Sequence, residues 1–468
     1  MIDLRRSRQY SFGDGLIAET TGELWEDWMR KADEVLEDEQ LISAVYEALL
    51  RRSPKSRTRG RRGTAAEVVL RMLLLKHLRN WSFQTVEREV RANLVYREFT
   101  RVGAGKVPDA KSLGRQAQAL GPEVIAQIHQ RMAALAVENG VVQEHRMRVD
   151  TTVVETNIHY PTDSSLLGDG LRVLTRLMKK VTGVAGDIGT KMRNRMRSVQ
   201  RRVAEIARAA RTKGEPGKEK LQGMYRKLLA ITGRVVAQAK RFSSEIAGGV
   251  KRSADVLKQA SLDGLKQEID TMISRTGQVI EQTKARIFGG NTHAEGKLVS
   301  VFETSTEIIR KGKASKPTEF GKMVKVQEAE NQIVISFEVY DRKPSDSDLL
   351  IPAIEVHQER LGRTPHLVAA DAGFFSMKNE EAAHELGVKR VSVPNRSTKS
   401  AARRQYQKQR WFKRGQKWRT GCEGRISLLK RRHGLRRSLY KKEAGMKRWV
   451  GLGVIADNLI NIGRALVR

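Results

Sequence analysis

Glu423 is one of only two acids in a strongly basic part of the chain. Residues 395–450 contain 20 Lys or Arg, and their only acids are Glu423 and Glu443. In a helix, Arg419, Glu423 and Lys430 would lie at i, i+4 and i+11, on roughly one face. A carboxylate on such a face can bind a divalent cation while its basic neighbours bind phosphates. The alternative is a solvated helix with one Arg–Glu ion pair.

A second carboxylate, Asp150, stands inside a predicted β-strand. Apolar or β-branched residues of the segment 147–153 alternate with Arg148, Asp150 and Thr152, a period typical of strands. Asp is disfavoured in strands, and burying its charge is costly unless it is paired or bound to a metal ion. Two interpretations follow: a paired or metal-binding Asp150, or an edge-strand Asp150 that faces water.

A third carboxylate, Asp371, directly follows the short apolar segment Leu367–Ala370. Ser376 is the predicted N-cap of the next helix, Gly387 ends that helix, and residues 390–393 form the following strand. This βαβ unit places Asp371 at the carboxyl end of a buried parallel strand, where α/β sheets place their functional sites. The alternative is a turn Asp that caps local backbone amides.

Asp150, Asp371 and Glu423 together favour a hard divalent cation. The chain has a single cysteine, Cys422, and no His at ligand spacing to the three acids, so Mg²⁺ or Mn²⁺ is the expected metal. Two such ions about 3.5–4 Å apart can activate water or a 3′-hydroxyl and stabilise the leaving oxygen of a phosphodiester. The sequence therefore predicts metal-dependent phosphoryl transfer on a nucleic acid.

The composition of the whole chain also indicates a nucleic-acid partner. Its 468 residues include 88 Lys or Arg against 53 Asp or Glu, a net charge of +35 that is spread along most of the sequence. Such an excess points to a polyanion, most simply DNA. A membrane surface is the second candidate, but no segment has the 18 or more uninterrupted apolar residues of a spanning helix. A glycosidase fits poorly, because aromatic residues are only 5% and a charge of +35 suits no neutral substrate.

The expected compartment is the cytoplasm. The first residues lack the apolar core of a signal peptide, and a single cysteine excludes an internal disulfide.

The expected scaffold for these acids is an α/β sheet. In the sequence, helical segments precede and follow its first strand, which contains Asp150. Helical periods cover the first 140 residues and include a basic loop at residues 51–63, which either contacts phosphate or is a solvated linker. Two helices that meet at residues 80–82 suit a helix-turn-helix or simple packing. Amphipathic helices with short breaks then run from about residue 165 to 290, which predicts an antiparallel bundle.

Strands resume after the helical segment. Residues 298–302 form one predicted strand, and residues 322–326 and 332–339 form a hairpin. The predicted fold is one α/β sheet whose first strand, with Asp150, is separated from the others by a long helical insertion.

The ordered set of acids resembles the DDE transposases of bacterial insertion sequences. Asp150-Thr-Thr152 is similar to the family's Asp-x-Thr strand, and Asp371-Ala-Gly-Phe374 to its strand-Asp-x-Gly-Phe turn. Arg419, Glu423 and Lys430 fit the family's Tyr-x2-Arg-x3-Glu-x6-Lys signature, with Gln416 in the place of Tyr. The segments 157–163 and 311–321 also resemble this group, particularly its ISNCY-like branch, and the resemblance covers about Trp25 to the C-terminus.

This resemblance implies an RNase-H-like mixed sheet with helices on both faces and a large all-helical insertion after the first strand. It also implies four segments: an N-terminal helical DNA-binding domain at 1–140, the first part of the catalytic core at 141–164, the helical insertion at 165–290, and the remainder of the core with C-terminal helices at 291–468.

The mechanism that the resemblance implies is cleavage of double-stranded DNA at the inverted repeats of the element, followed by joining of the freed 3′-hydroxyl to target DNA. Asp150, Asp371 and Glu423 are the expected catalytic residues and the ligands of two Mg²⁺ or Mn²⁺ ions. Further copies of the chain, in a homodimer or larger assembly on transposon ends and target DNA, are the expected protein partners; no membrane is expected. The expected DNA contacts are Arg419, Lys430, Arg425, Arg51, Arg59, Arg61, Lys311 and Lys313, and the accessory candidates are Thr152, His159 and Gly373.

Two other functions would use the same features. An RNase-H-like nuclease without strand transfer would need the same three acids. A non-catalytic DNA-binding relic of a transposase would keep the positive charge, but its acids would be dispensable.

Overall fold

The structure is a computed structural model that describes residues 1–6, 12–52, 54–59, 63–143, 145–210, 214–293, 295–310 and 317–468. The chain divides into two units. The core unit comprises residues 1–157 and 309–468, and the insertion unit comprises residues 158–308. The predicted boundaries at residues 140, 164 and 290 stay predictions.

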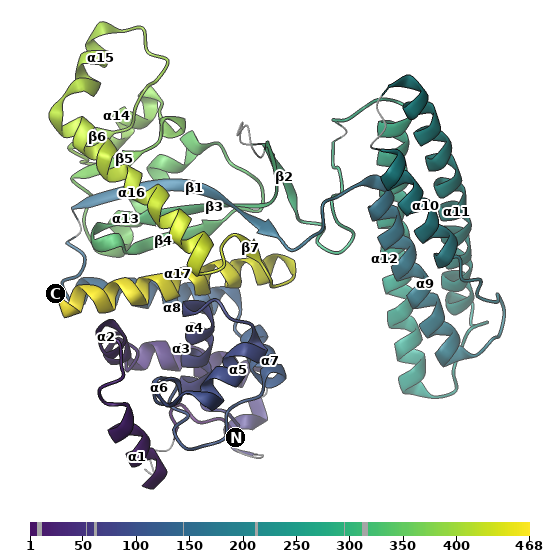
Figure 1. The fold of residues 1–468 in the computed structure, drawn as a ribbon, viewed down its shortest axis with the longest axis horizontal. Helices are drawn as coiled ribbons and strands as arrows, with labels where there is room; N and C mark the ends of the chain where they lie inside the picture. The colour runs from purple at the N-terminus through teal and green to yellow at the C-terminus, as the bar shows by residue number, and fades with distance from the viewer. Residues whose placement is uncertain are drawn as a thin grey trace. The chain divides into compact units, whose positions relative to one another are not determined.

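A seven-stranded mixed sheet forms the centre of the core unit (Figure 1). Its main path is β2-β3-β1-β5-β6, with β4 paired to β3 and β7 paired to β1. β1 is antiparallel to β3 and parallel to β5, and β5 is parallel to β6. The strands are β1 (Arg146–Thr156), β2 (Glu307–Arg310), β3 (Thr318–Glu328), β4 (Val334–Val339), β5 (Leu367–Ala370), β6 (Arg390–Ser392) and β7 (Arg437–Ser438). Because β1 has neighbours on both sides, the interpretation of Asp150 as an edge-strand residue is wrong.

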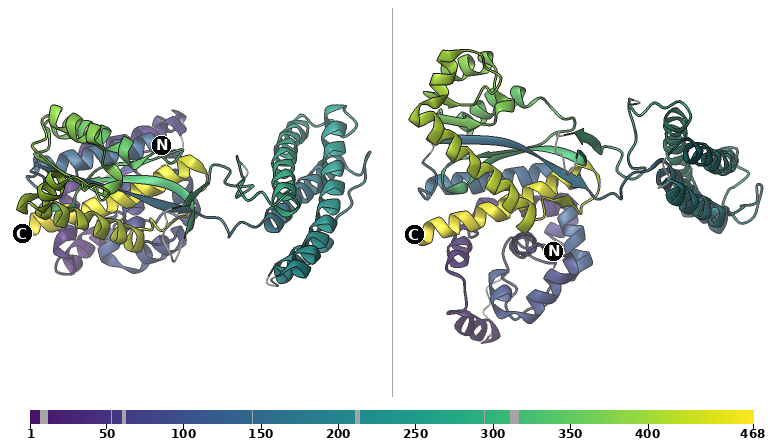
Figure 2. Two further views of the ribbon diagram at one scale, coloured as in Figure 1. Left: turned by 90° about the horizontal axis from the view of Figure 1, so that it is seen from above. Right: turned by 45° about the horizontal axis from the view of Figure 1, so that its top comes forward.

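Helices cover both faces of the sheet. Met147 and Val149 of β1 pack on the face covered by α13 and α14. Val154 packs on the opposite face, which α16 and α17 cover; Figure 2 shows both helices against the sheet from further directions. The helices of this part are α13 (Leu350–Leu361), α14 (Met377–Glu385), α15 (Ala401–Lys408), α16 (Arg410–Arg432) and α17 (Lys442–Val467). Two short 3₁₀ helices, η3 (Asp346–Leu349) and η4 (Ala372–Phe374), precede α13 and follow β5.

The strands around the site follow the sequence patterns closely. β3 and β4 form the predicted hairpin. β5, α14 and β6 form the predicted parallel βαβ unit, and the Ser376 side chain accepts a hydrogen bond from the Asn379 amide at the start of α14.

The N-terminal helices pack in the same unit as the sheet. They are α1 (Phe12–Thr21), α2 (Asp27–Val35), α3 (Glu39–Arg52), α4 (Ala66–Leu78), α5 (Phe83–Ala92), α6 (Leu94–Phe99), α7 (Ala110–Ala119) and α8 (Pro122–Glu138), with the 3₁₀ turn η1 (Pro54–Arg57) after α3. α17 contacts α2, α4 and α8, and its Leu452, Ile455 and Leu459 belong to their hydrophobic core. α17 is long and apolar enough to cross a membrane, but most of its apolar window is buried, as in the core helix of a globular unit.

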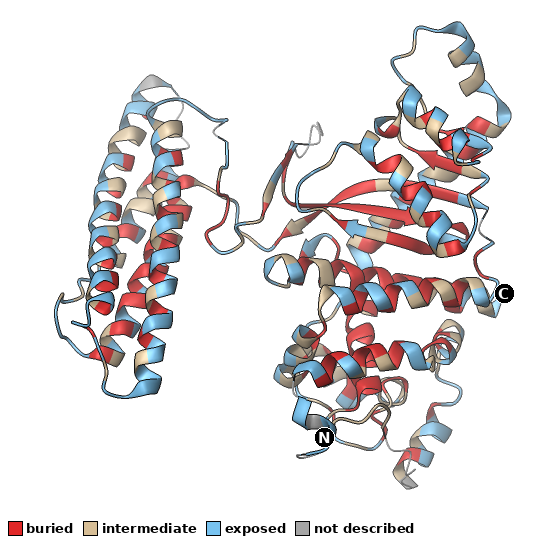
Figure 3. Cartoon of the chain, turned by 180° about the vertical axis from the view of Figure 1, so that it is seen from behind, coloured by how far each residue is buried: buried red, intermediate tan, exposed pale blue. Residues whose placement is uncertain are grey.

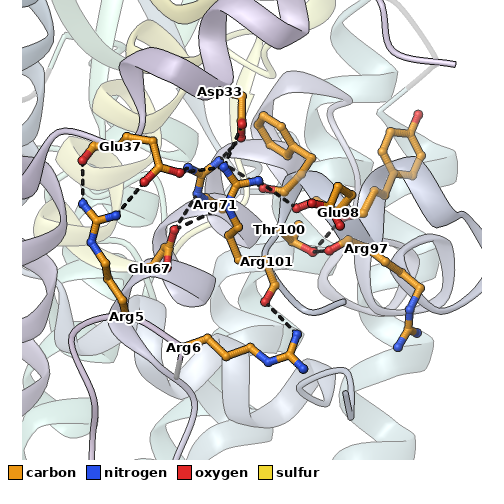
Figure 4. A network of polar contacts seen from close by, with 12 residues as sticks. Arg5, Arg6, Asp33, Glu37, Glu67, Arg71, Arg97, Glu98, Thr100 and Arg101 are labelled. Carbon is orange, nitrogen blue, oxygen red and sulfur yellow. Dashed lines mark hydrogen bonds and ion pairs between the residues drawn. The ribbon is translucent and has the colours of Figure 1, made fainter. Parts of the chain in front are cut away.

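A buried ionic network fixes the N-terminal helices to one another (Figure 4). Arg71 of α4 is fully buried and pairs with Asp33, Glu37 and Glu67. Arg101 also contacts Asp33 and Glu37, at 2.7 and 2.6 Å. Burial alone would raise the pKa of Glu37, but the hydrogen bond from Arg101 and the charges of Arg71 and Arg101 lower it to about 2.

The insertion unit is a helical bundle with its own core. Its helices are α9 (Asp163–Ala185), α10 (Met196–Ala209), α11 (Glu215–Ala247) and α12 (Val256–Ile287). Their buried residues face one another and their exposed residues face outward (Figure 3). The predicted strand at residues 298–302 is wrong: Leu298 and Val301 instead pack into the core of this bundle.

Candidate functional site

Asp150 and Asp371 occupy the same step of two adjacent parallel strands. Val149 of β1 is in register with Ala370, the last residue of β5. Asp150 follows Val149 within β1, and Asp371 directly follows the end of β5. Val149 and Ala370 point into the core beneath α13. Because side chains alternate along a strand, both Asp residues face the other side of the sheet, where α16 lies.

Asp371 ends β5 in a tight turn. Its Oδ1 accepts a hydrogen bond from the Ala372 amide at 2.7 Å, so Asp371 does cap local backbone. The same oxygen lies 3.4 Å from Nη2 of Arg396, in the loop after β6. The Asp371 side chain is 44% exposed, which leaves it open to a ligand.

Arg419 connects the other two acids. Its Nη2 donates to Oε1 of Glu423 at 2.9 Å, and its Nη1 lies 3.8 Å from Oδ2 of Asp150. The Glu423 side chain is 55% exposed, whereas Arg419 is nearly buried. The predicted Arg–Glu pair on α16 is therefore present, and it is joined to the first Asp of the set.

Gln416 anchors α16 to the carboxyl ends of two strands. Its Nε2 donates to the carbonyl oxygen of Ser392 at 2.5 Å and lies 3.3 Å from that of Ala370. Ala370 directly precedes Asp371, so the residue that stands in the place of the family Tyr fixes α16 beside the second Asp.

Gly421 lets α16 approach the sheet closely. A Cβ atom at this position would lie 2.1 Å from Nη1 of Arg148 on β1. Arg148 is two residues before Asp150 on β1, and Gly421 is two residues before Glu423 on α16, so the glycine sets how near the helix comes to the first strand.

A buried ionic cluster joins the strands and helices that carry the site. Arg148 donates to Glu328 of β3 and, at 2.6 Å, to the carbonyl oxygen of Trp418 on α16. Arg425 pairs with Asp457 of α17 at 2.7 Å and lies 3.5 Å from Glu328. Burial raises the pKa of Glu328 to about 7 against the opposing charges of Arg148 and Arg425. Charged groups from β1, β3, α16 and α17 thus hold the elements that carry the acids.

The prediction that Arg425 contacts DNA is wrong. Its side chain is only 3% exposed and is bound to Asp457, so it cannot reach a phosphate. Lys430 lies two turns beyond Glu423 and is half-buried, and Arg51 and Arg59 are exposed; their DNA contacts stay predictions. Arg61, Lys311 and Lys313 lie outside the described residues.

The accessory candidates belong to different units: Thr152 and Gly373 to the core unit, and His159 to the insertion unit. Thr152 is buried within β1. His159 belongs to the insertion unit, where its Nε2 lies 3.5 Å from Oδ2 of Asp169. Gly373 is exposed in the turn after Asp371, and a Cβ atom there would lie 3.2 Å from Oδ2 of Asp346.

Two residues near the acids were missed by the sequence reasoning. Asp346 accepts a hydrogen bond from Thr151 Oγ1 at 3.0 Å, so it connects β1 to the turn that carries Gly373. Arg396 faces Asp371. Their sequence signals were weak: Asp346 lies in a Ser- and Asp-rich turn, and Arg396 is one cation of a long basic stretch.

The donor set suits hard divalent cations. Asp150, Asp371 and Glu423 offer only carboxylate oxygens, and burial raises the pKa of the neighbouring Cys422 thiol well above its usual value, which keeps it from competing as a thiolate. Among the described residues, no group of three or more acidic, His or Cys side chains is close enough to share an ion. Binding of one ion by all three acids would therefore require side chains to move from the positions that they have here.

Comparison with known proteins identifies two domains. Residues 25–118 match a family model described as a transposase domain (DUF772), and residues 295–459 match one described as a transposase DDE domain. No curated protein and no solved structure matches the chain. The second match contains Asp371, Glu423 and most of the sheet, whereas Asp150 and residues 158–294 of the insertion unit lie outside both matches.

Proposed function

The chain is a DDE transposase of an insertion sequence, and we propose that it binds the terminal inverted repeats of its own element, cleaves DNA there and joins the freed end to target DNA. We further propose that the sheet is an RNase-H-like catalytic core, that the reaction takes place in the cytoplasm, and that copies of the chain pair two ends as a dimer or larger assembly. The observation that carries the proposal is the register of β1 and β5, which puts Asp150 and Asp371 side by side under α16.

Asp150, Asp371 and Glu423 would hold two Mg²⁺ or Mn²⁺ ions. When bound, such ions activate the attacking oxygen and stabilise the leaving oxygen of a phosphodiester. The exposed side chains of Asp371 and Glu423 would face the DNA, and Asp150 would be the less accessible ligand between the two strands that flank it.

Arg419 would have two roles in this site. Its charge offsets the repulsion between Asp150 and Glu423. Its Nε and Nη1 have no hydrogen-bond acceptor among the described residues, and a buried N–H without an acceptor costs about 1–3 kcal/mol. Because these groups are buried, a phosphate oxygen could accept from them only after the Arg419 side chain moves, and such a contact would remove that cost.

The test is cleavage of labelled DNA that carries the two ends flanking the gene, with Mg²⁺ or Mn²⁺. We expect Asp150→Asn, Asp371→Asn and Glu423→Gln to bind this DNA but to cut it about 100-fold more slowly or worse, because the ions contribute several kcal/mol to the transition state. The matched control is Glu443→Gln, which neutralises the only other acid of the basic stretch and should cut normally.

Each alternative gives a different result. Variants that cut as well as the wild type would show that the site assignment is wrong. A wild type that cuts but never yields joined products would favour a nuclease without strand transfer. A wild type that binds the ends and never cuts with either ion would favour a non-catalytic relic.

A further inference from the structure

One flank of α11, in the insertion unit, is an uninterrupted stripe of positive charge. Residues 220–244 contain six Lys or Arg and no acid. Four of them, Lys220, Lys227, Arg234 and Arg241, recur at seven-residue steps, and all four are exposed. A seven-residue step drifts by only about 20° around a helix, so the four share one flank. They follow each other about 10 Å apart and span roughly 30 Å.

The segment before α10 adds cations beside the middle of this stripe. Lys191, Arg193 and Arg195 lie there, and Nε2 of Gln238 on α11 donates to the carbonyl oxygen of Lys191 at 2.9 Å. Burial lowers the pKa of Arg195, and the nearby charges of Arg193 and Arg234 lower it further. Cations from two separate parts of the unit therefore face the same region.

Buried polar contacts hold this segment in place. Lys251 is fully buried, and its Nζ donates to the carbonyl oxygens of Ile188 and Thr190. Glu245 pairs with Lys251 at 3.3 Å and accepts from the Thr190 amide at 2.9 Å. The positive segment is thus fixed against α11 by the fold and is not an unconstrained loop.

The charge of the stripe is not compensated within the described part of the chain. There, none of Lys220, Lys227, Arg234 and Arg241 forms an ion pair. α12 of the same bundle differs: it has five cations and four acids, and its Lys266 and Lys284 pair with Asp270 and Glu281 at 2.8 and 2.9 Å. Clustered like charges destabilise a free protein, so the stripe favours a polyanionic partner.

We propose that this basic flank, defined by Lys220, Lys227, Arg234 and Arg241 of α11 with Lys191, Arg193 and Arg195, binds the sugar-phosphate backbone of duplex DNA. The regular spacing along a straight helix suits a rod with one negative charge per about 1.7 Å. Stacking on single-stranded bases is disfavoured, because the aromatic residues of α11, Tyr225 and Phe242, are buried. The inference rests on the proposed function only in taking DNA as the polyanion, and it assigns the insertion a direct DNA contact.

The experiment compares full-length variants on a labelled DNA duplex of arbitrary sequence, and on one of its single strands, over a range of salt concentrations. The test variant is Lys227→Gln/Arg234→Gln/Arg241→Gln. The matched control, Lys258→Gln/Lys266→Gln/Lys284→Gln, removes the same charge from α12. A third variant, Lys227→Arg/Arg234→Lys/Arg241→Lys, keeps the charge of the flank. The melting temperature of each variant is measured to verify folding.

We expect the test variant to lose about 10-fold or more in affinity at low salt, and the slope of log K against log salt to fall by about 2.7, three times the 0.9 that one phosphate contact contributes. The control and the charge-keeping variant should bind like the wild type. Equal slopes for the test variant and the wild type, an equal loss in the control, or a loss seen only with single-stranded DNA would overturn the proposal.

Failure of the proposed function would look different. A wild type that never cuts its ends but shows the slope difference would keep the basic flank and reject the transposition mechanism. Normal cleavage of the ends by the wild type, with equal slopes for the wild type and the test variant, would keep the transposition mechanism and reject the basic flank.

Discussion

Arg419 shows how one side chain can serve both the folded site and its ligand. The guanidinium contacts Asp150 and Glu423 at once, from β1 and α16. Its planar fork allows this double contact, which the single ammonium group of Lys could not reproduce. Charges of opposite sign therefore assemble at the site before any DNA is present.

Glu37 gives a prediction about acid stability at the scale of one residue. Its pKa is lowered to about 2 in the folded chain, so its ionised form stabilises the fold above the unfolded-state pKa, about 4.5. This contribution should be lost as the pH falls from about 4.5 through about 2. Glu37→Gln, which cannot titrate, should be less stable than the wild type at pH 7 and should show a smaller loss over that interval.

Urea unfolding at a series of pH values measures this difference. Glu47→Gln is a suitable control, since the ion pair of Glu47 in the described part of the chain is an exposed contact of 3.5 Å with Arg57. The same pH dependence in Glu37→Gln and the wild type would contradict the role of Glu37 in the network.

At the scale of elements, the close contact of α16 with β1 predicts the effect of a single methyl group. In Gly421→Ala the new Cβ would collide with Arg148, which is buried and paired with Glu328. We expect a loss of about 1–3 kcal/mol from overpacking, or 3–5 kcal/mol if the buried pair breaks. Gly424→Ala on the same helix meets no atom within 4 Å, so it should stabilise the helix by about 0.5–1 kcal/mol. Chemical denaturation of both variants checks the prediction, and equal stabilities would contradict it.

The elements that carry the acids could largely be predicted from the sequence. The alternation around Asp150 and the apolar segment before Asp371 indicated two strands, because both patterns depend on neighbours within a few residues. The βαβ unit also fixed which end of its strand carries Asp371. The pairing of β1 with β5 could not be predicted from these local patterns, since 371 − 150 = 221 positions separate the two acids.

The sequence did not predict which element packs on each face of a helix or strand. Arg425 looked like a DNA contact because it lies among cations, but its partner Asp457 is on α17, 32 residues later. The segment 298–302 has a strand-like composition, yet its apolar side chains fill the core of the bundle. Periodicity reports which side of an element is apolar and says nothing of the element that packs on it.

At the scale of the whole molecule, the two units have separate hydrophobic cores, which predicts independent folding of the insertion. The core of the insertion unit comes from α9–α12 and residues 298 and 301. Expressed alone, residues 158–308 should be helical by circular dichroism and should melt in one cooperative transition. A fragment that is unfolded, or that melts without cooperativity, would show that the insertion depends on the rest of the chain.

The distance along the chain between β1 and β5 has a consequence for the timing of synthesis. β1 emerges from the ribosome long before the strand that must pair with it beside Asp150, and at roughly 5–20 residues per second the interval is about 10–45 seconds. α16 and then α17, which closes against the N-terminal helices, follow later still. A growing chain therefore cannot assemble the three acids, and under the proposed mechanism DNA near the translating ribosome would meet only a protein that is not yet able to cut.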